Sequence, residues 1–214
     1  IAKGNYPAEI NLKIPFSLLV HEESENRMKV MPGYWFLYNM YALARNSWKY
    51  VDRDKRIDKT QCIEYDYLAP DSVEEMFTAL QIMESAVGKA SLADQPGLDE
   101  AEYQQAGKKL LITRPEDAAR LTVYIDGLEN SNRRNLLIKA HKAYPVFREM
   151  IVLYGVECLL RYLQDNQIHS WKVLLDALSG AKREDWCNVG GQLMPCSEMV
   201  AMQKDIHNGS IKSW

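Results

Sequence analysis

Long apolar runs are absent from this chain of 214 residues. A helix that spans a membrane needs about 20 apolar residues, and no stretch reaches even about 18. No positively charged start leads into the short apolar core that signal peptides carry. We therefore expect a cytoplasmic protein with no membrane partner. Because the first residue is Ile1 rather than Met, we also expect a fragment or a processed form.

A strong excess of one charge is missing as well. The chain has 26 lysine and arginine residues against 29 aspartate and glutamate residues, which gives a net charge of −3. Proteins that bind nucleic acid usually present a strongly basic face, so this balance argues against a nucleic-acid partner. The hydrophobic fraction of 47% is ordinary for a globular protein and allows a sizeable core.

Recognisable metal and catalytic motifs are also lacking. The four cysteines form no CxxC pair and have no zinc-ligand spacing, so we interpret them as reduced thiols. A disulfide between Cys187 and Cys196 is the open alternative, although nothing in the spacing supports it. The four histidines have no HExxH motif, and no Glu-x-x-His repeat of a di-metal bundle is present. The sequence therefore predicts no metal site and no cofactor, and it identifies no catalytic residue.

The first thirty residues have the pattern of β structure. In AEINLKIPFSLLV, apolar residues alternate with polar ones from Ile10 to Leu18, which is typical of a half-buried strand. Pro15 cannot donate to a β-ladder, so we expect an edge strand or a break there. The segment HEESEN predicts a polar turn, and RMKVM predicts a second strand.

The period of the apolar residues changes after Pro32–Gly33. From Tyr34 to about Tyr50, aromatic and aliphatic side chains recur every three or four residues, which predicts a helix. They form two adjacent stripes, so we expect this helix to be buried over most of its circumference, with Trp48 in the core.

Helical spacing continues through most of the remaining chain. Residues 69–88, APDSVEEMFTALQIMESAVG, form the clearest pattern, with Ser72 and Glu75 as a capping box and Gly88 as the stop. Further helices are expected at about 99–110, nearly throughout 115–165, at about 168–178 and at 197–207. The sequence therefore predicts a mainly α fold, a multi-helix bundle or layered array. We expect a short β segment at residues 1–33 and a helical domain at residues 34–214.

Two features are candidates for ligand binding. Basic residues recur at helical spacing after the aromatic stretch, and they could bind phosphate or carboxylate groups: Arg45, Lys49, Arg53 and Arg56. The alternative is a solvated face paired with the neighbouring aspartates. The double glycine of NVGGQLMP, Gly190 and Gly191, precedes a predicted helix and could expose backbone amides to an anion. The alternative is a tight turn that needs a positive φ.

Several segments carry a resemblance to a known family: GNYPAEI, IPFSLL, VMPGYWFLYNMYALARNSWKYVDRDKR, IEYDYLAPDS and NVGGQL. They resemble the C-terminal helical region of an uncharacterised bacterial family. Its larger proteins carry a hexapeptide-repeat left-handed β-helix similar to those of sugar-nucleotidyltransferases and acyltransferases. The resemblance implies that residues 8–31 leave the β-helix, and the ending GSIKSW looks cut short. This chain has no hexapeptide repeats, so a transferase site built on them would lie outside it.

Two functional hypotheses follow. The first is a helical accessory module that supports assembly or substrate access in a larger β-helix protein, with no catalysis of its own. Its protein partner would be an intramolecular β-helix domain or a second copy of the chain. The alternative is a unit that binds a sugar phosphate, nucleotide or nucleotide sugar through the basic residues and the double glycine.

Overall fold

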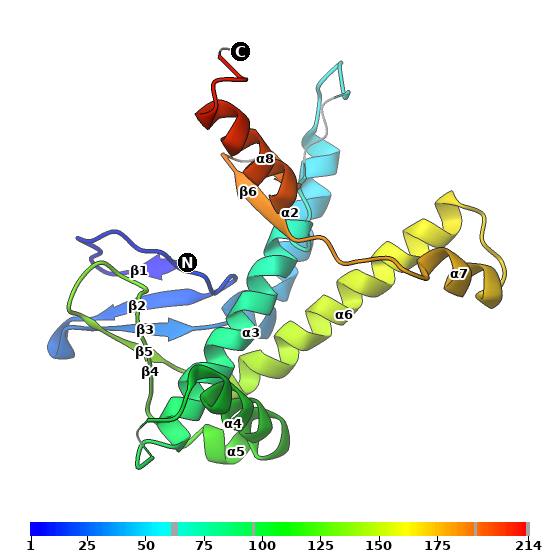
Figure 1. The fold of residues 1–214 in the computed structure, drawn as a ribbon. Coiled ribbons are helices and arrows are strands. Elements are labelled where there is room, and N and C mark those ends of the chain that lie inside the picture. Colours follow the sequence, from blue (N-terminus) through cyan, green and yellow to red (C-terminus); the bar gives the residue numbers. More distant parts are fainter. Residues whose placement is uncertain (61–63, 96, 191, 213–214) are drawn as a thin grey trace. The chain divides into compact units, whose positions relative to one another are not determined.

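The computed structural model describes residues 1–60, 64–95, 97–190 and 192–212 (Figure 1). Of these described residues, 52% are helical and 14% are in strands. It divides into two compact units: Ile1–Tyr67 with Glu75–Ile151, and Leu68–Glu74 with Val152–Trp214. None of the described helices has the length and apolar character needed to cross a membrane.

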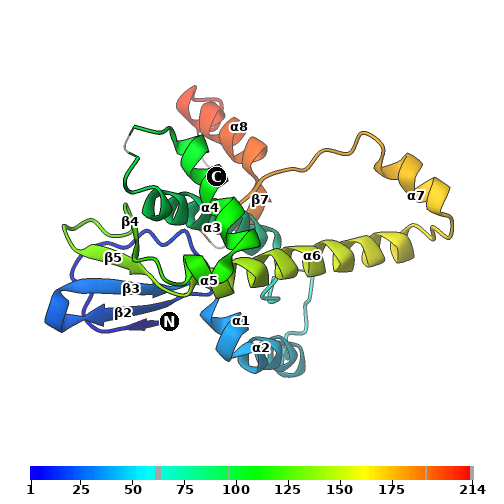
Figure 2. The same cartoon turned by 90° about the horizontal axis from the view of Figure 1, so that it is seen from below.

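In the described part of the chain, the first unit is built on a five-stranded mixed sheet (Figures 1 and 2). The strands lie in the order β1-β2-β3-β5-β4. Their bounds are β1 Ala2–Lys3, β2 Leu18–Glu22, β3 Arg27–Met31, β4 Val123–Ile125 and β5 Arg134–Leu137. β2–β3 and β4–β5 are antiparallel, whereas β1–β2 and β3–β5 are parallel. The 3₁₀ turn η1 (Glu23–Glu25) closes the β2–β3 hairpin, as the polar segment HEESEN predicted.

The prediction of a mainly α fold is wrong, because the protein is mixed α/β. Strands β4 and β5 lie within residues 115–165, which we expected to be helical nearly throughout. Their short apolar runs fit a buried strand and a helical stripe equally well, so periodicity alone did not separate the two. The second predicted strand, RMKVM, is β3. The first begins only at Leu18, after a turn that contains Pro15.

The sheet shares its core with two long helices, α3 (Pro70–Ser91) and the first half of α6 (Ala140–Asp165). The largest fully buried side chains include Met28 and Val30 of β3, Met76 and Met83 of α3, and Tyr144 and Phe147 of α6. Each buried side chain of this size contributes roughly 1.5–3 kcal/mol relative to an exposed one. This core is the main source of stability in the first unit.

Helix α4 (Glu100–Thr113) crosses α3 at unusually short range, because a glycine of each helix faces the backbone of the other. A Cβ at Gly88 would lie 1.8 Å from the carbonyl oxygen of Tyr103, and a Cβ at Gly107 would lie 1.8 Å from that of Glu84. The prediction that Gly88 stops its helix is therefore wrong. α3 runs on to Ser91, and the glycine serves helix packing.

The helix starts also differ in part from the predictions. Ser72 is not the N-cap of α3; its hydroxyl lies inside the first turn and accepts a hydrogen bond from the amide of Ala69 at 2.9 Å. A complete capping box occurs instead on α4, between Asp99 and Glu102. The short α5 (Pro115–Ala118) follows α4 with proline in its first turn.

The aromatic stretch forms two helices, α1 (Tyr34–Tyr38) and α2 (Met40–Arg53), which meet at Asn39. Phe36 of α1 joins the core, with its ring centroid 4.4 Å from that of Phe16 and 6.2 Å from that of Phe147. α2 has no buried residue, and its Trp48 side chain is 66% exposed. The prediction that Trp48 lies in the core is therefore wrong, although the helical period was correct.

The second unit contains the first turn of α3, the second half of α6, α7 (Trp171–Leu178), a β6–β7 hairpin and α8 (Cys196–His207). The hairpin strands are β6 (Trp186–Val189) and β7 (Gln192–Pro195). Two contacts hold the hairpin and its preceding loop to the first turn of α3. Asn188 Nδ2 donates to Asp71 Oδ2 at 3.0 Å, and Arg183 forms an ion pair with Glu74.

Candidate functional site

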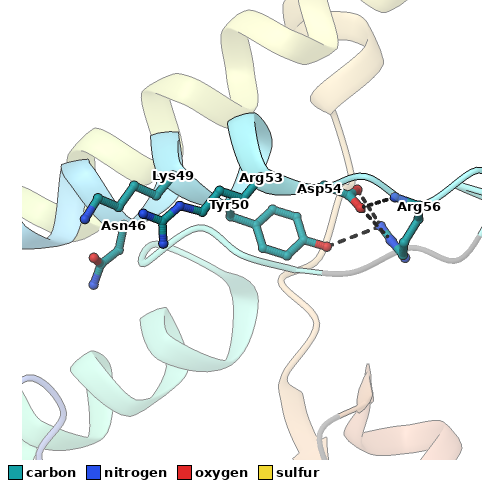
Figure 3. Close-up of a pocket in the computed structure, with 6 residues that line it drawn as sticks. All are labelled: Asn46, Lys49, Tyr50, Arg53, Asp54 and Arg56. Carbon is teal, nitrogen blue, oxygen red and sulfur yellow. Dashed lines mark hydrogen bonds and ion pairs between the residues drawn. The ribbon is translucent and has the colours of Figure 1, made fainter.

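An open hollow lies at the C-terminal end of α2 (Figure 3). It has a volume of about 590 Å³ and is lined by Asn46, Lys49, Tyr50, Arg53, Asp54 and Arg56. Three of the four predicted basic residues therefore line one hollow. The head groups of Asn46, Lys49 and Arg53 gather at one end of it, and the Arg56–Asp54 pair lies at the other (Figure 3).

The charge of Arg56 is already neutralised within the protein. Its Nε and Nη2 donate to the two carboxylate oxygens of Asp54, each at 2.9 Å, and Nη2 also donates to the hydroxyl of Tyr50 at 3.2 Å. Hydrogen bonds from the Arg56 side chain and backbone lower the pKa of Asp54 to about 2. Arg56 therefore shapes the end of the hollow, and its charge is not available to a ligand.

Lys49 and Arg53 differ from Arg56, because neither has an ion pair with any described residue. The four-residue spacing on α2 places them on the same side of the helix. The ring of Tyr50 stacks on that of Tyr65, with centroids 4.6 Å apart and planes 17° apart. Two free cations beside an amide and an aromatic pair can hold a small anion with a flat ring.

The other predicted site residues lie elsewhere. Arg45 does not line the hollow, and its guanidinium carbon lies 5.8 Å from the ring centroid of Tyr41. Gly190 lies in the turn between β6 and β7 with a φ of 62°, as the tight-turn interpretation predicted. Gly191 lies outside the described residues. The strand β7 separates this turn from α8, so the double glycine does not directly precede a helix.

A second hollow, of about 330 Å³, lies where α3, α4 and β4 meet. Two of its charged groups pair with each other. Lys89 Nζ lies 2.8 Å from Glu100 Oε2, and Ser85 donates to the same carboxylate. The hydrogen bond from Lys89, followed by that from Ser85, lowers the pKa of Glu100. Asp126 also lines the hollow; it is exposed and has no ion pair with any described residue.

Among the described residues, no group of three or more histidine, cysteine, aspartate or glutamate side chains could hold a metal ion.

An exposed apolar surface belongs to the second unit. On α7, the side chains of Trp171, Leu175 and Leu178 are 70%, 50% and 42% exposed, whereas only Leu174 is buried. The helical spacing predicted a helix at about 168–178, and α7 spans Trp171–Leu178. The spacing could not indicate that the apolar stripe faces outward, because periodicity identifies a face but not what covers it.

The second half of α6 presents a similar stripe. Val152, Val156 and Leu160, spaced by four residues, are 64%, 46% and 53% exposed. In the first half of the same helix, Tyr144 and Phe147 are fully buried. One continuous helix thus changes from a core element to an exposed apolar one near Ile151.

Comparison with known proteins gives one relative. An uncharacterised protein of Treponema pallidum (strain Nichols) is 32% identical over 221 residues, which cover 100% of this chain and 29% of the relative. The chain thus spans less than a third of the length of the curated relative it matches. No family model matches the chain, and no solved structure does.

Proposed function

We propose that this chain is an accessory interaction module of a longer protein. Its second unit docks through the outward stripes of α7 and α6 onto another part of the same polypeptide. Following the resemblance described above, the proposed partner is a left-handed β-helix of transferase type, and the proposed location is the cytoplasm. The module itself carries no catalysis.

The exposed stripe of α7 is the observation that carries this proposal. A helix in a free-standing domain normally turns its apolar side to the core. Here Trp171, Leu175 and Leu178 follow one another at four and three residues and are all exposed. Covering them completely would contribute roughly 3–5 kcal/mol, since each already has part of its surface buried. Contiguous apolar surface of this kind marks an interaction site.

The length of the relative supports an intramolecular partner. More than two thirds of the Treponema pallidum protein lies outside the matched region, while the match covers this chain completely. A neighbouring region of one polypeptide has a high effective concentration, so a modest apolar surface suffices to hold it.

Hydrogen exchange tests the proposal directly. The backbone amides of α7 should exchange much more slowly in the longer protein than in the isolated chain, because docking excludes solvent and prevents local opening. The double variant Trp171→Ala/Leu175→Ala should remove this protection and lower the Tm of the longer protein. Lys172→Ala on the same helix is the matched control and should change neither.

Two results would contradict intramolecular docking. One is equal exchange of the α7 amides in both proteins. The other is protection that rises with protein concentration and vanishes on dilution, which would assign the surface to contacts between copies.

A second candidate function is anion binding in the hollow on α2. The observation that favours it is the pair Lys49 and Arg53, which have no acidic partner among the described residues. The ligand would be a sugar phosphate or a nucleotide, held by these cations and by the exposed face of the tyrosine stack.

Thermal unfolding with glucose 1-phosphate and with ADP tests this candidate. Binding should raise the Tm in a saturable way, and Arg53→Ala should weaken it at least tenfold. Arg45→Ala removes the same charge from the same helix outside the hollow, so it should bind like the wild type. No saturable shift with either ligand, or an equal loss in both variants, would reject a specific site.

A further inference from the structure

Two cysteines of the second unit lie on the same face of the β6–β7 hairpin and its continuation. The ladder pairs Cys187 with Met194 and Trp186 with Pro195. It extends by one more pair, since the amide of Cys196 donates to the carbonyl oxygen of Asp185 at 2.8 Å. Side chains two residues apart on a strand point to the same face, so Cys187 and Cys196 are diagonal neighbours across the ladder.

The surroundings of the two thiols agree with this register. Cys187 Sγ donates to the carbonyl oxygen of Met194 at 3.6 Å, in the pair of the ladder next to Cys196. Partial burial, followed by the hydrogen bond to Cys187, raises the pKa of Cys196. Both cysteines are free and half-buried. The register therefore places the two free thiols as diagonal neighbours on one face of the hairpin.

The remaining described cysteine has a different environment. Cys158 lies on α6, and its Sγ accepts a hydrogen bond from Arg161 at 3.5 Å. It therefore serves as an internal control for thiol chemistry at Cys187 and Cys196.

A disulfide bond between Cys187 and Cys196 would stabilise the β6–β7 hairpin. β6 and β7 form a two-stranded sheet, and such a hairpin is marginally stable without further support. A link from Cys187 of β6 to the first residue of α8 would close a short loop that contains the hairpin turn and all of β7. It would also fix the start of the helix to the sheet.

Small molecules can reach one of the two sulfurs. Cys196 lines an open hollow of about 470 Å³, together with Lys182, Arg183, Glu184, Asp185 and Ser197. A low-molecular-weight disulfide can approach the thiol from this side.

We infer that Cys187 and Cys196 form a reversible dithiol–disulfide pair whose co-reactant is a low-molecular-weight disulfide such as oxidised glutathione. The Cys196 thiol loses its proton and attacks one sulfur of glutathione disulfide, which forms a mixed disulfide and releases one glutathione thiolate. Cys187, as the thiolate, then attacks the sulfur of Cys196 and releases the second glutathione. The two protons that the cysteines lose are taken up by the two glutathione thiolates. The two electrons from the cysteines reduce the disulfide bond of oxidised glutathione.

The test is equilibration of the whole chain in glutathione redox buffers, followed by alkylation of free thiols and mass spectrometry. In oxidising buffer, the protein should lose two hydrogen atoms and leave two cysteines unalkylated. Peptide mapping should join the segment of Cys187 to that of Cys196. Reducing buffer should restore both thiols. The oxidised protein should also show slower amide exchange in β6 and β7 than the reduced protein.

Variants distinguish this pair from incidental oxidation. Cys158→Ser should leave the linked peptide unchanged, whereas Cys187→Ser should replace it with a stable mixed disulfide on Cys196. Full alkylation of Cys187 and Cys196 in oxidising buffer would overturn the inference. Pairing of either one with Cys158 or Cys62 would overturn it as well. The wild-type measurement alone decides between these outcomes, so the result does not depend on the folding of a variant.

Discussion

The close crossing of α3 and α4 yields a sharp prediction for Gly107→Ala. In most helix interiors this change stabilises a protein by about 0.5–1 kcal/mol, because alanine has the better helix propensity. Here the new methyl group would lie 1.8 Å from the carbonyl oxygen of Glu84 and 2.6 Å from the amide nitrogen of Gly88. Both obstacles are backbone atoms, so no side-chain rotation relieves the overlap, and the helices must separate.

The magnitude follows from the size of this displacement. Overpacking a core usually costs about 1–3 kcal/mol even where side chains can adjust. Separating the two helices by more than about 1 Å would also weaken the dispersion contacts along the crossing. We therefore expect a net loss of about 3 kcal/mol in the free energy of unfolding. For a chain of this length that corresponds to a fall in Tm of roughly 6–12 °C.

Gly155→Ala is the matched control. Gly155 lies within α6, and a Cβ there would meet nothing within 4 Å. The same substitution should raise the free energy of unfolding by about 0.5–1 kcal/mol. Thermal and urea unfolding followed by circular dichroism would measure both variants. Stability of Gly107→Ala equal to that of the wild type or of the control would refute the backbone-contact argument.

Two further predictions concern α2 and the hollow at its end. Trp48→Ala should change the free energy of unfolding by less than about 1 kcal/mol, because the side chain is 66% exposed. A loss of about 3 kcal/mol or more, measured by urea unfolding, would show instead that Trp48 is part of the core. The lowered pKa of Asp54, about 2, stabilises the folded state above the unfolded pKa of about 4, and this contribution disappears as the pH falls through 2. Asp54→Asn should therefore flatten the dependence of Tm on pH between about 4 and 2, and an unchanged slope in acid titration would show that the pair with Arg56 contributes nothing.

Helices α1 and α2 show what the periodicity of apolar residues can and cannot predict. The recurrence of apolar residues after Tyr34 correctly predicted helical structure. The division into α1 and α2 at Asn39 was not predicted, because it interrupts the apolar pattern by a single residue. The predicted burial of Trp48 was wrong. Aromatic side chains in a helical stripe usually lie in the core, but they can also form a surface that binds a partner. Phe36 and Trp48 have the same kind of neighbours in sequence, yet only Phe36 has Phe16 and Phe147 against it. Those contacts join residues far apart in the chain.

The missed strands have a different cause. β5 has Asn135 and Leu137 buried and pairs with β3, so its stability depends on a partner more than a hundred residues earlier in the chain. A four-residue strand has too few positions for alternation to be distinguished from a helical stripe. The close packing of α4 against Gly88 could not be predicted from the sequence either. A glycine near the predicted end of a helix suits a C-cap, and only the position of α4 shows its packing role.

The candidate site was predictable to the extent that its residues are neighbours in sequence. Lys49, Arg53 and Arg56 line one hollow because they follow one another along and just beyond α2. Their individual states were not predictable. Arg56 is neutralised by Asp54, which lies two residues away, whereas Arg53 has no such partner among the described residues. Charge spacing alone assigns the same role to both.

The sequence does contain the signal for the structural element that brings Cys187 and Cys196 to the same face, a β-hairpin. A double glycine between apolar residues is a standard signal for a two-residue hairpin turn, and in NVGGQL it stands between Val189 and Leu193. A hairpin centred on that turn places Cys187 opposite Met194 and brings Cys196 to the next position on the same face. We interpreted the glycines in relation to the helix that follows, so the strands were missed and the cysteines remained unconnected. Register, rather than the spacing of the cysteines, is what brings the two sulfurs together.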